Sequence, residues 1–218
     1  MKKILFSLFT LFTLTIINKA SAQKGFSLSI KGTPQFSWLQ NKGDNDNSNY
    51  SRNATFRAAF GVGAGYNFTN TIGLGLGVLY SLQGQKYDLN NTEYNQKVHY
   101  LKVPLMFAYN TNPAKKVAFV GKIGPQVSFL TDSKLEGKEG NEINGNTNDI
   151  YKNVTFGGVA NAGAQFLLTR NLFLNAGVRF DYDFTNAENE DYSSYPAGRA
   201  DTHNMTTGLE VGLKYQLK

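Results

Sequence analysis

The sequence contains no cysteine among its 218 residues, and it has only two histidines, His99 and His203. Without cysteine the chain has neither a disulfide scaffold nor a thiolate metal site, and it lacks a cysteine nucleophile. A lipid anchor attached to a cysteine after a signal sequence is excluded for the same reason.

Long hydrophobic runs are also lacking beyond residue 22, so no transmembrane helix is expected there. Before that point, Lys2 and Lys3 precede an apolar stretch, Ile4–Ile17, and the run Ala20-Ser21-Ala22 has the A-x-A cleavage pattern. We therefore predict a signal peptide over residues 1–22 and a single mature domain over residues 23–218. The alternative, a short N-terminal membrane anchor, is disfavoured because the stretch is too short to span a bilayer comfortably.

The mature chain has little net charge. The formal charge of +6 includes Lys2, Lys3 and Lys19, and without them 19 cations face 16 anions. The basic excess is therefore partly a property of the predicted signal peptide. We expect no nucleic-acid partner.

What the sequence does contain is a period-two pattern. In Phe26–Leu39, apolar residues such as Leu28 and Ile30 alternate with polar residues such as Ser29 and Lys31. Because a strand points successive side chains to opposite faces, this segment has one apolar and one polar face. The same alternation defines eight predicted strands: Phe26–Leu39, Thr55–Phe68, Thr71–Gln83, Val98–Tyr109, Val117–Thr131, Val154–Leu168, Leu172–Thr185 and Met205–Leu217.

The predicted fold is all-β, an eight-stranded antiparallel up-and-down transmembrane β-barrel. Three connections are short, namely Asn67–Thr71, Asn110–Lys116 and Thr169–Asn171. Four are long and rich in Asn, Asp, Gly and Ser, namely Gln40–Ala54, Gly84–Gln96, Asp132–Asn153 and Asn186–Asn204. All long connections then lie at one end, as extracellular loops do in outer-membrane barrels. We expect residence in the outer membrane, with the lipid bilayer as partner and both termini in the periplasm.

The composition of the two faces favours the same placement. Charges of both signs occur on the polar face, and inside a small barrel they must pair because an isolated buried charge is costly. The residues expected to fill the lumen are Lys31, Arg57, Lys102, Lys122, Arg179, Asp181, Asp183, Glu210 and Lys214. Aromatic residues cluster at both strand ends of the apolar face, as expected for girdles at two membrane interfaces. The expected girdle residues are Phe26, Trp38, Tyr66, Tyr80, Tyr109, Phe129, Phe166, Tyr182 and Tyr215.

Three segments carry a family resemblance: Tyr100-Leu101-Lys102-Val103-Pro104-Leu105-Met106, Gly121-Lys122-Ile123-Gly124-Pro125 and Leu209-Glu210-Val211-Gly212-Leu213-Lys214-Tyr215. The first resembles the Y-L-x-x-P-L motif of the PorT-like outer-membrane β-barrel proteins common in Bacteroidetes. The resemblance implies an outer-membrane barrel and an encounter with the barrel-insertion machinery. The chain ends in Tyr215-Gln216-Leu217-Lys218 and so lacks the terminal aromatic residue that such machinery usually recognises.

Other features suggest chemistry only weakly. A hydrolase or acyltransferase site could be assembled from His99, His203, Asp201, Ser193 and Ser194, but their spacing matches no known motif. Asp181 and Asp183 share a face and suit a metal, yet an ion network with Arg179 is favoured. We therefore expect no catalytic, cofactor or metal site and no enzyme activity. Two further expectations are a bulge at Pro104 and Pro125 and solvated loop charge at Asp44, Asp46 and Glu136–Glu142.

Eight strands leave an interior just wide enough for side chains, so we expect no wide pore. Glycines on the inner face of the second and third strands would leave at most a small local cavity. The expected role is structural or interaction-based: an outer-membrane barrel that presents long loops, with an extracellular or envelope protein partner left open. The alternatives are a soluble exported barrel that binds a small apolar ligand as lipocalins do, or an outer-membrane enzyme.

Overall fold

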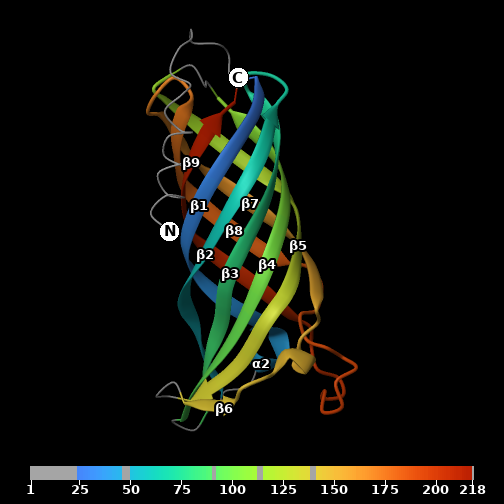
Figure 1. Cartoon of the computed structure of the whole chain (residues 1–218). Helices are drawn as coiled ribbons and strands as arrows, with labels where there is room; N and C mark the ends of the chain where they lie inside the picture. Colours follow the sequence, from blue (N-terminus) through green and yellow to red (C-terminus); the bar gives the residue numbers. More distant parts are fainter. Residues whose placement is uncertain (1–23, 46–49, 90–91, 112–114, 138–140, 218) are drawn as a thin grey trace, which may run out of the picture.

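The computed structural model describes residues 24–45, 50–89, 92–111, 115–137 and 141–217, and Figure 1 shows them as a barrel of tilted strands. The predicted signal peptide lies outside these residues. The elements are β1 (Gly25–Asn41), α2 (Lys42–Asn45), β2 (Tyr50–Asn67), β3 (Ile72–Leu89), β4 (Thr92–Asn110), β5 (Val117–Gly137), β6 (Glu142–Asn144), η1 (Asn148–Ile150), β7 (Val154–Leu167), β8 (Leu172–Asp183) and β9 (Thr202–Gln216).

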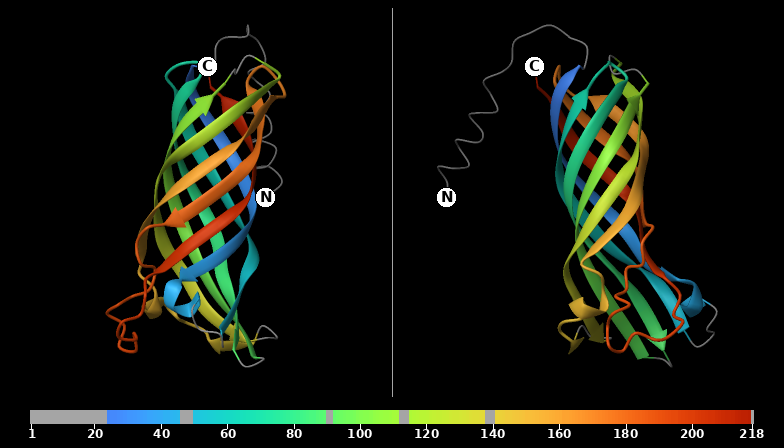
Figure 2. Two further views of the ribbon diagram at one scale, coloured as in Figure 1. Left: turned by 180° about the vertical axis from the view of Figure 1, so that it is seen from behind. Right: turned by 90° about the vertical axis from the view of Figure 1, so that its right-hand side faces the viewer.

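Eight long strands form one closed antiparallel ring, in the order β1, β2, β3, β4, β5, β7, β8 and β9. The ring closes where β9 pairs with β1, from Ser27 opposite Gln216 to Asn41 opposite Thr202. Figure 2 shows the strands crossing the wall obliquely on every side. The short β6 pairs with the end of β5. The predicted eight-stranded antiparallel barrel is confirmed.

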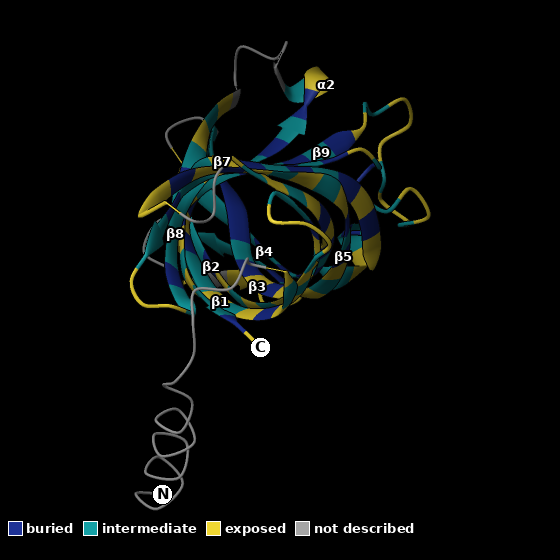
Figure 3. Cartoon of the chain, turned by 90° about the horizontal axis from the view of Figure 1, so that it is seen from above, coloured by how far each residue is buried: buried dark blue, intermediate teal, exposed yellow. Residues whose placement is uncertain are grey.

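The apolar faces of the strands point outward. Leu28 is 53% exposed and Val178 is 54% exposed, whereas Lys102 and Arg179 are each 2% exposed. Figure 3 shows the resulting alternation of buried and exposed residues along the strands. The alternative of a soluble lipocalin-like barrel, which would have an apolar interior, is therefore wrong. In the described ranges, the helices are too short and too polar for any of them to cross a membrane.

The strands extend further at the long-loop end than their apolar pattern indicates. The prediction of a long loop over Gly84–Gln96 is wrong, because β3 and β4 continue as a paired hairpin up to Leu89 opposite Thr92. Polar side chains replace apolar ones here and bond inside the barrel. The Leu39 amide, for example, donates to Gln85 Oε1 over 2.9 Å. In the other predicted long loops, β2 begins at Tyr50, β5 continues to Gly137, and β6 and η1 occupy part of the remainder.

The two strand prolines do not produce the predicted bulge. Pro104 of β4 lies opposite Gln126, and the same β4–β5 register resumes at Phe107 opposite Ile123. The register shift between these strands lies at His99/Tyr100 instead. The β5–β7 register is unbroken through Pro125. Each proline interrupts the ladder locally without adding a residue to either strand.

Close approach of two strands requires a glycine at Gly124 on the inner side of β5. A Cβ atom at this position would overlap the backbone carbonyl oxygen of Leu105 on β4. Three residues earlier on the same strand, a Cβ atom at Gly121 would have no neighbour within 4 Å. Substituting each glycine by alanine therefore distinguishes the effect of crowding between β4 and β5 from the effect of losing a glycine.

We predict that Gly124→Ala destabilises the folded barrel by about 1–3 kcal/mol, because the added methyl forces the backbones of β4 and β5 apart. Gly121→Ala serves as the control and leaves stability nearly unchanged. Urea unfolding of the purified chain in lipid vesicles measures both. Equal stability of the two variants would contradict the packing seen between β4 and β5.

Candidate functional site

The candidate site is the charged network at the centre of the lumen, organised around Arg179 of β8. Its guanidinium donates from Nε and Nη2 to both oxygens of Asp181, over 2.9 and 2.7 Å. Nη1 donates to Glu210 Oε2 of β9 over 3.0 Å, and Nη2 donates to Gln126 Oε1 of β5 over 3.0 Å. Asp181 lies two positions after Arg179, so both point to the same face of the strand. The planar fork of the guanidinium suits this bidentate contact.

Three lysines, from β1, β4 and β5, complete the network. Lys102 Nζ of β4 lies 3.7 Å from Asp181 Oδ1. Lys31 of β1 and Lys122 of β5 each lie 3.5 Å from a Glu210 oxygen. Thr206 Oγ1 also donates to Asp181. Five strands are thus joined across the lumen, and each buried carboxylate has several donors, as the cost of burying charge requires.

Three other predicted lumen residues lie outside this network. Asp183 Oδ2 accepts hydrogen bonds from Thr155 and Asn204, each over 2.8 Å. Arg57 donates to Asn95 Oδ1 over 3.1 Å. Lys214 lies over the Phe173 ring, 5.1 Å from its centroid. The structure therefore brings together six of the nine predicted charges.

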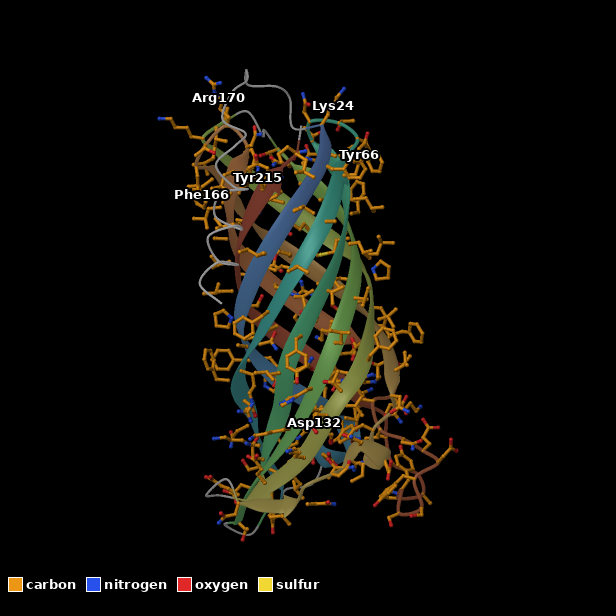
Figure 4. All side chains as sticks on the ribbon, in the orientation of Figure 1. Lys24, Tyr66, Asp132, Phe166, Arg170 and Tyr215 are labelled. Carbon is orange, nitrogen blue, oxygen red and sulfur yellow. The ribbon has the colours of Figure 1, made fainter. Side chains whose placement is uncertain are left out.

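The predicted girdle residues lie on the outer face. Phe26, Tyr66, Tyr80, Tyr109 and Phe129 are exposed, while Trp38, Phe166, Tyr182 and Tyr215 are partly covered by their neighbours. Figure 4 places Tyr66, Phe166 and Tyr215 at the short-turn end, opposite the end that carries Asp132. Edge-to-face packing joins Phe26 and Tyr66, whose ring centroids are 4.8 Å apart.

An apolar plug closes the lumen at the long-loop end. Leu39 of β1, Val98 and Tyr100 of β4, and Tyr151 form a buried cluster, with Leu130 and Ile150 packed against it. Tyr151 follows η1 and forms a β-bridge with Glu188. Sequence reasoning missed Tyr151, because it stands alone in a segment without periodicity.

An ion cluster beside the plug connects two loops that are far apart in the sequence. Arg199 lies 3.0 Å from Asp44 Oδ1, and its Nη2 donates to Glu188 Oε1 over 2.7 Å. The hydrogen bonds to Glu188 raise the pKa of Arg199 above its ordinary value. Thr202 Oγ1 also donates to Glu188. The expectation of solvated charge at Asp44 is wrong, because this carboxylate is largely buried against Arg199.

The same correction applies to Glu136, which pairs with Lys97 across the β4–β5 hairpin extension. Asp46 and the side chain of Glu142 lie outside the described residues. Sequence reasoning missed both pairings because the contact partners are not neighbours in the sequence and carry no pattern.

The two histidines lie far apart on the outer face. His99 belongs to β4 and His203 to β9, and three strands separate β4 from β9 in either direction around the ring. His99 contacts Tyr80 and lies 3.8 Å from Asp132, while His203 packs on Tyr182. Ser193 and Ser194 are exposed in the β8–β9 loop. Across the described ranges, no group of three His, Asp or Glu side chains is arranged to hold a metal ion.

Comparison with known proteins identifies the architecture. The outer membrane protein beta-barrel domain family matches residues 18–187. Neisserial surface protein A is 13% identical with a TM-score of 0.52, covering 89% of this chain and 98% of its own. OprG from Pseudomonas aeruginosa is 12% identical with a TM-score of 0.51, covering 92% of this chain and 100% of its own. A major outer membrane protein from Thermus thermophilus is 14% identical with a TM-score of 0.51, covering 87% and 98%. No curated protein matches the chain.

We predict that Arg179→Met destabilises the barrel by about 3–5 kcal/mol, because Asp181 and Glu210 lose their shared partner while remaining buried. Arg170→Met is the control, since Arg170 is exposed in the β7–β8 turn. Urea unfolding in lipid vesicles measures both. An Arg179→Met variant as stable as the control would refute the central role of this network.

Proposed function

The chain belongs to the outer membrane protein beta-barrel domain family, and from this premise we propose that it is a closed-lumen membrane anchor whose ordered long-loop end contacts another molecule at the cell surface. It is an integral outer-membrane β-barrel protein whose outward apolar residues face lipid. The observation that carries the proposal is the contrast between a filled lumen and a structured loop end.

The filled lumen favours an anchor over a solute pore. Arg179, Asp181 and Gln126 are each at most 2% exposed, so the network occupies the middle of the barrel. The cluster around Tyr100 and Tyr151 closes the lumen again nearer the loops. An eight-stranded ring has room for side chains and little else.

The structured loop end favours an interaction role. The Arg199 cluster joins α2 of the β1–β2 loop to the β8–β9 loop. The β3–β4 hairpin and β5 extend the wall by strand pairing toward the same end. A surface already ordered before contact loses less conformational entropy on binding than free loops do.

A catalytic role has little support on this surface. The two histidines stand on opposite walls of the ring, and Ser193 and Ser194 have exposed side chains. Our proposal is therefore a protein without enzyme activity. It includes export through the signal peptide at residues 1–22, periplasmic termini and insertion by the barrel-insertion machinery.

The finer placement among PorT-like proteins is also part of this proposal. Its support is the segment Tyr100–Met106, whose residues Tyr100, Lys102, Pro104 and Met106 are all buried on the luminal side. A motif that fills the lumen specifies architecture, and it assigns no physiological task to the chain.

A conductance measurement tests the closed lumen. Purified protein reconstituted in planar lipid bilayers should show no stable conducting state, because side chains occupy the barrel centre. A general porin in the same preparation provides the positive control. Reproducible conductance steps from the purified chain would overturn the anchor proposal in favour of a pore.

In-cell photo-crosslinking tests the interaction role. A photoreactive residue at exposed Ser193 in the long-loop end should give a discrete adduct in intact cells, and one at exposed Asn70 in the β2–β3 turn should not. Arg199→Ala should weaken the Ser193 adduct, because the loop loses its pairing with Asp44 and Glu188. Lys152→Ala is the matched control, since its pair with Glu190 is exposed and contributes little. Absence of adducts from the loop end would count against the proposal.

A further inference from the structure

A cavity of about 110 Å³ lies inside the barrel between the Arg179 network and the short-turn end. We call it the short-turn cavity. Its rim includes Asn70 and Thr71 of the β2–β3 turn, and Lys31, Lys122 and Lys214 also line it. It lies at the opposite end of the lumen from the plug formed by Leu39 and Tyr151.

Glycines, which have no side chain, create this space. The wall formed by β2 and β3 carries Gly63, Gly65, Gly73, Gly75 and Gly77 on its inner side. At this level of the barrel, β2 and β3 have glycines on their inner side, whereas β1, β5 and β9 have Lys31, Lys122 and Lys214. Since roughly 10–15 Å³ of such volume holds one water, the cavity has room for a small polyatomic ion.

The lining of the short-turn cavity carries positive charge without a carboxylate. Lys31, Lys122 and Lys214 come from β1, β5 and β9, and neither Asp nor Glu lines the cavity among the described residues. Lys31 and Lys122 share one partner, Glu210, which also accepts a hydrogen bond from Arg179.

Lys214 is the cation with the weakest compensation. Its ammonium lies against the Phe173 ring, and no carboxylate of the described residues lies within ion-pair distance of it. The Arg179 network holds four cations, namely Arg179, Lys31, Lys102 and Lys122, against two carboxylates, Asp181 and Glu210. Outside the network, Lys214 adds a cation at the cavity, and the buried carboxylate Asp183 is bonded to Thr155 and Asn204. An excess of enclosed positive charge attracts an anion, and low-dielectric walls strengthen that attraction.

Neutral hydrogen-bond donors surround the lysines. Ser27 and Ser29 line the short-turn cavity, and within the described part of the chain each hydroxyl makes one long contact of 3.4 Å to a backbone carbonyl of β2. In the adjoining recess, which Lys122 and the carboxylate Glu210 also line, Asn161 is 8% exposed. Its buried Nδ2 has no hydrogen-bond acceptor among the described residues. A buried donor without an acceptor is costly, and the oxygen of a bound anion would satisfy it.

We propose that the short-turn cavity is a binding site for a small oxyanion of the phosphate class that enters from the short-turn, periplasmic side. Lys31 and Lys122 reach it from opposite walls of the ring, and Lys214 approaches from the mouth. Ammonium groups bind phosphate oxygens as point charges with several rotatable donors. This site is separate from the loop-end surface on which the proposed interaction role depends.

Calorimetric titration of the purified full chain in detergent micelles tests the proposal, with inorganic phosphate as the probe at constant ionic strength and pH 7. The wild-type chain should bind phosphate with saturable one-to-one stoichiometry. Lys214→Met should weaken binding roughly tenfold or more, the usual effect of losing one charged hydrogen-bond donor. Lys116→Met, an equal charge change at an exposed position of the same end, should leave binding unchanged.

A second variant tests whether binding requires the space of the cavity as well as the charge of its lysines. A Cβ atom on Gly75 meets only ordinary contacts, at 3.7 and 4.0 Å, so Gly75→Leu fills the space without forcing the strands apart. This variant keeps all three lysines and should lose phosphate binding. Folding of each variant is verified by heat-modifiable gel migration, and Lys214→Gln replaces Lys214→Met if the latter does not fold.

Several results would overturn the assignment. Absence of saturable phosphate binding by the wild-type chain would do so directly. Full binding by Gly75→Leu, or equal loss in Lys214→Met and Lys116→Met, would place the ion on the surface instead. Acetate binding as tight as phosphate binding would contradict the assignment to the phosphate class.

Discussion

Closure of the backbone hydrogen-bond ladder is the constraint on which the rest of this structure depends. In the hydrocarbon of a membrane no water is present to satisfy an exposed strand edge, so a spanning sheet must pair its first strand with its last. Pairing of β1 with β9 meets this requirement along nearly the full length of both strands. The outward row of apolar residues, including Ile30 paired with Val62 and Leu213, is then the surface that lipid covers.

Closure with eight strands also determines which side chains meet in the lumen. The narrow lumen brings side chains from opposite walls within contact distance, so Lys31 of β1 and Lys122 of β5 both reach Glu210. Charges that would be independent on an open sheet become one coupled network around Arg179. The same crowding explains Gly124, where the inner side of β5 has no space for a methyl group beside the Leu105 carbonyl.

The sequence predicts the outer and inner faces well because period-two alternation is a local property of each strand. It predicts the hairpin extension of β3 and β4 poorly, since Gln85 and Gln96 are polar residues that bond inside the barrel and so carry no apolar signal. The contact between Arg199 and Asp44 spans 155 residues and has no local pattern. Tyr151 likewise becomes part of the plug only through the folding of the loop that precedes β7.

The two ends of the lumen differ because the chain distributes bulk and charge unevenly along its strands. Toward the loops, aromatic and aliphatic side chains from β1 and β4 pack with Tyr151 in a buried cluster. Toward the short turns, glycines on β2 and β3 remove bulk where three lysines converge. A barrel needed only as an inert anchor gains nothing from this second arrangement, because enclosed like charges repel and lower stability. Retaining the lysines therefore argues that the short-turn end accommodates a compensating anion, while the loop end supplies the ordered surface.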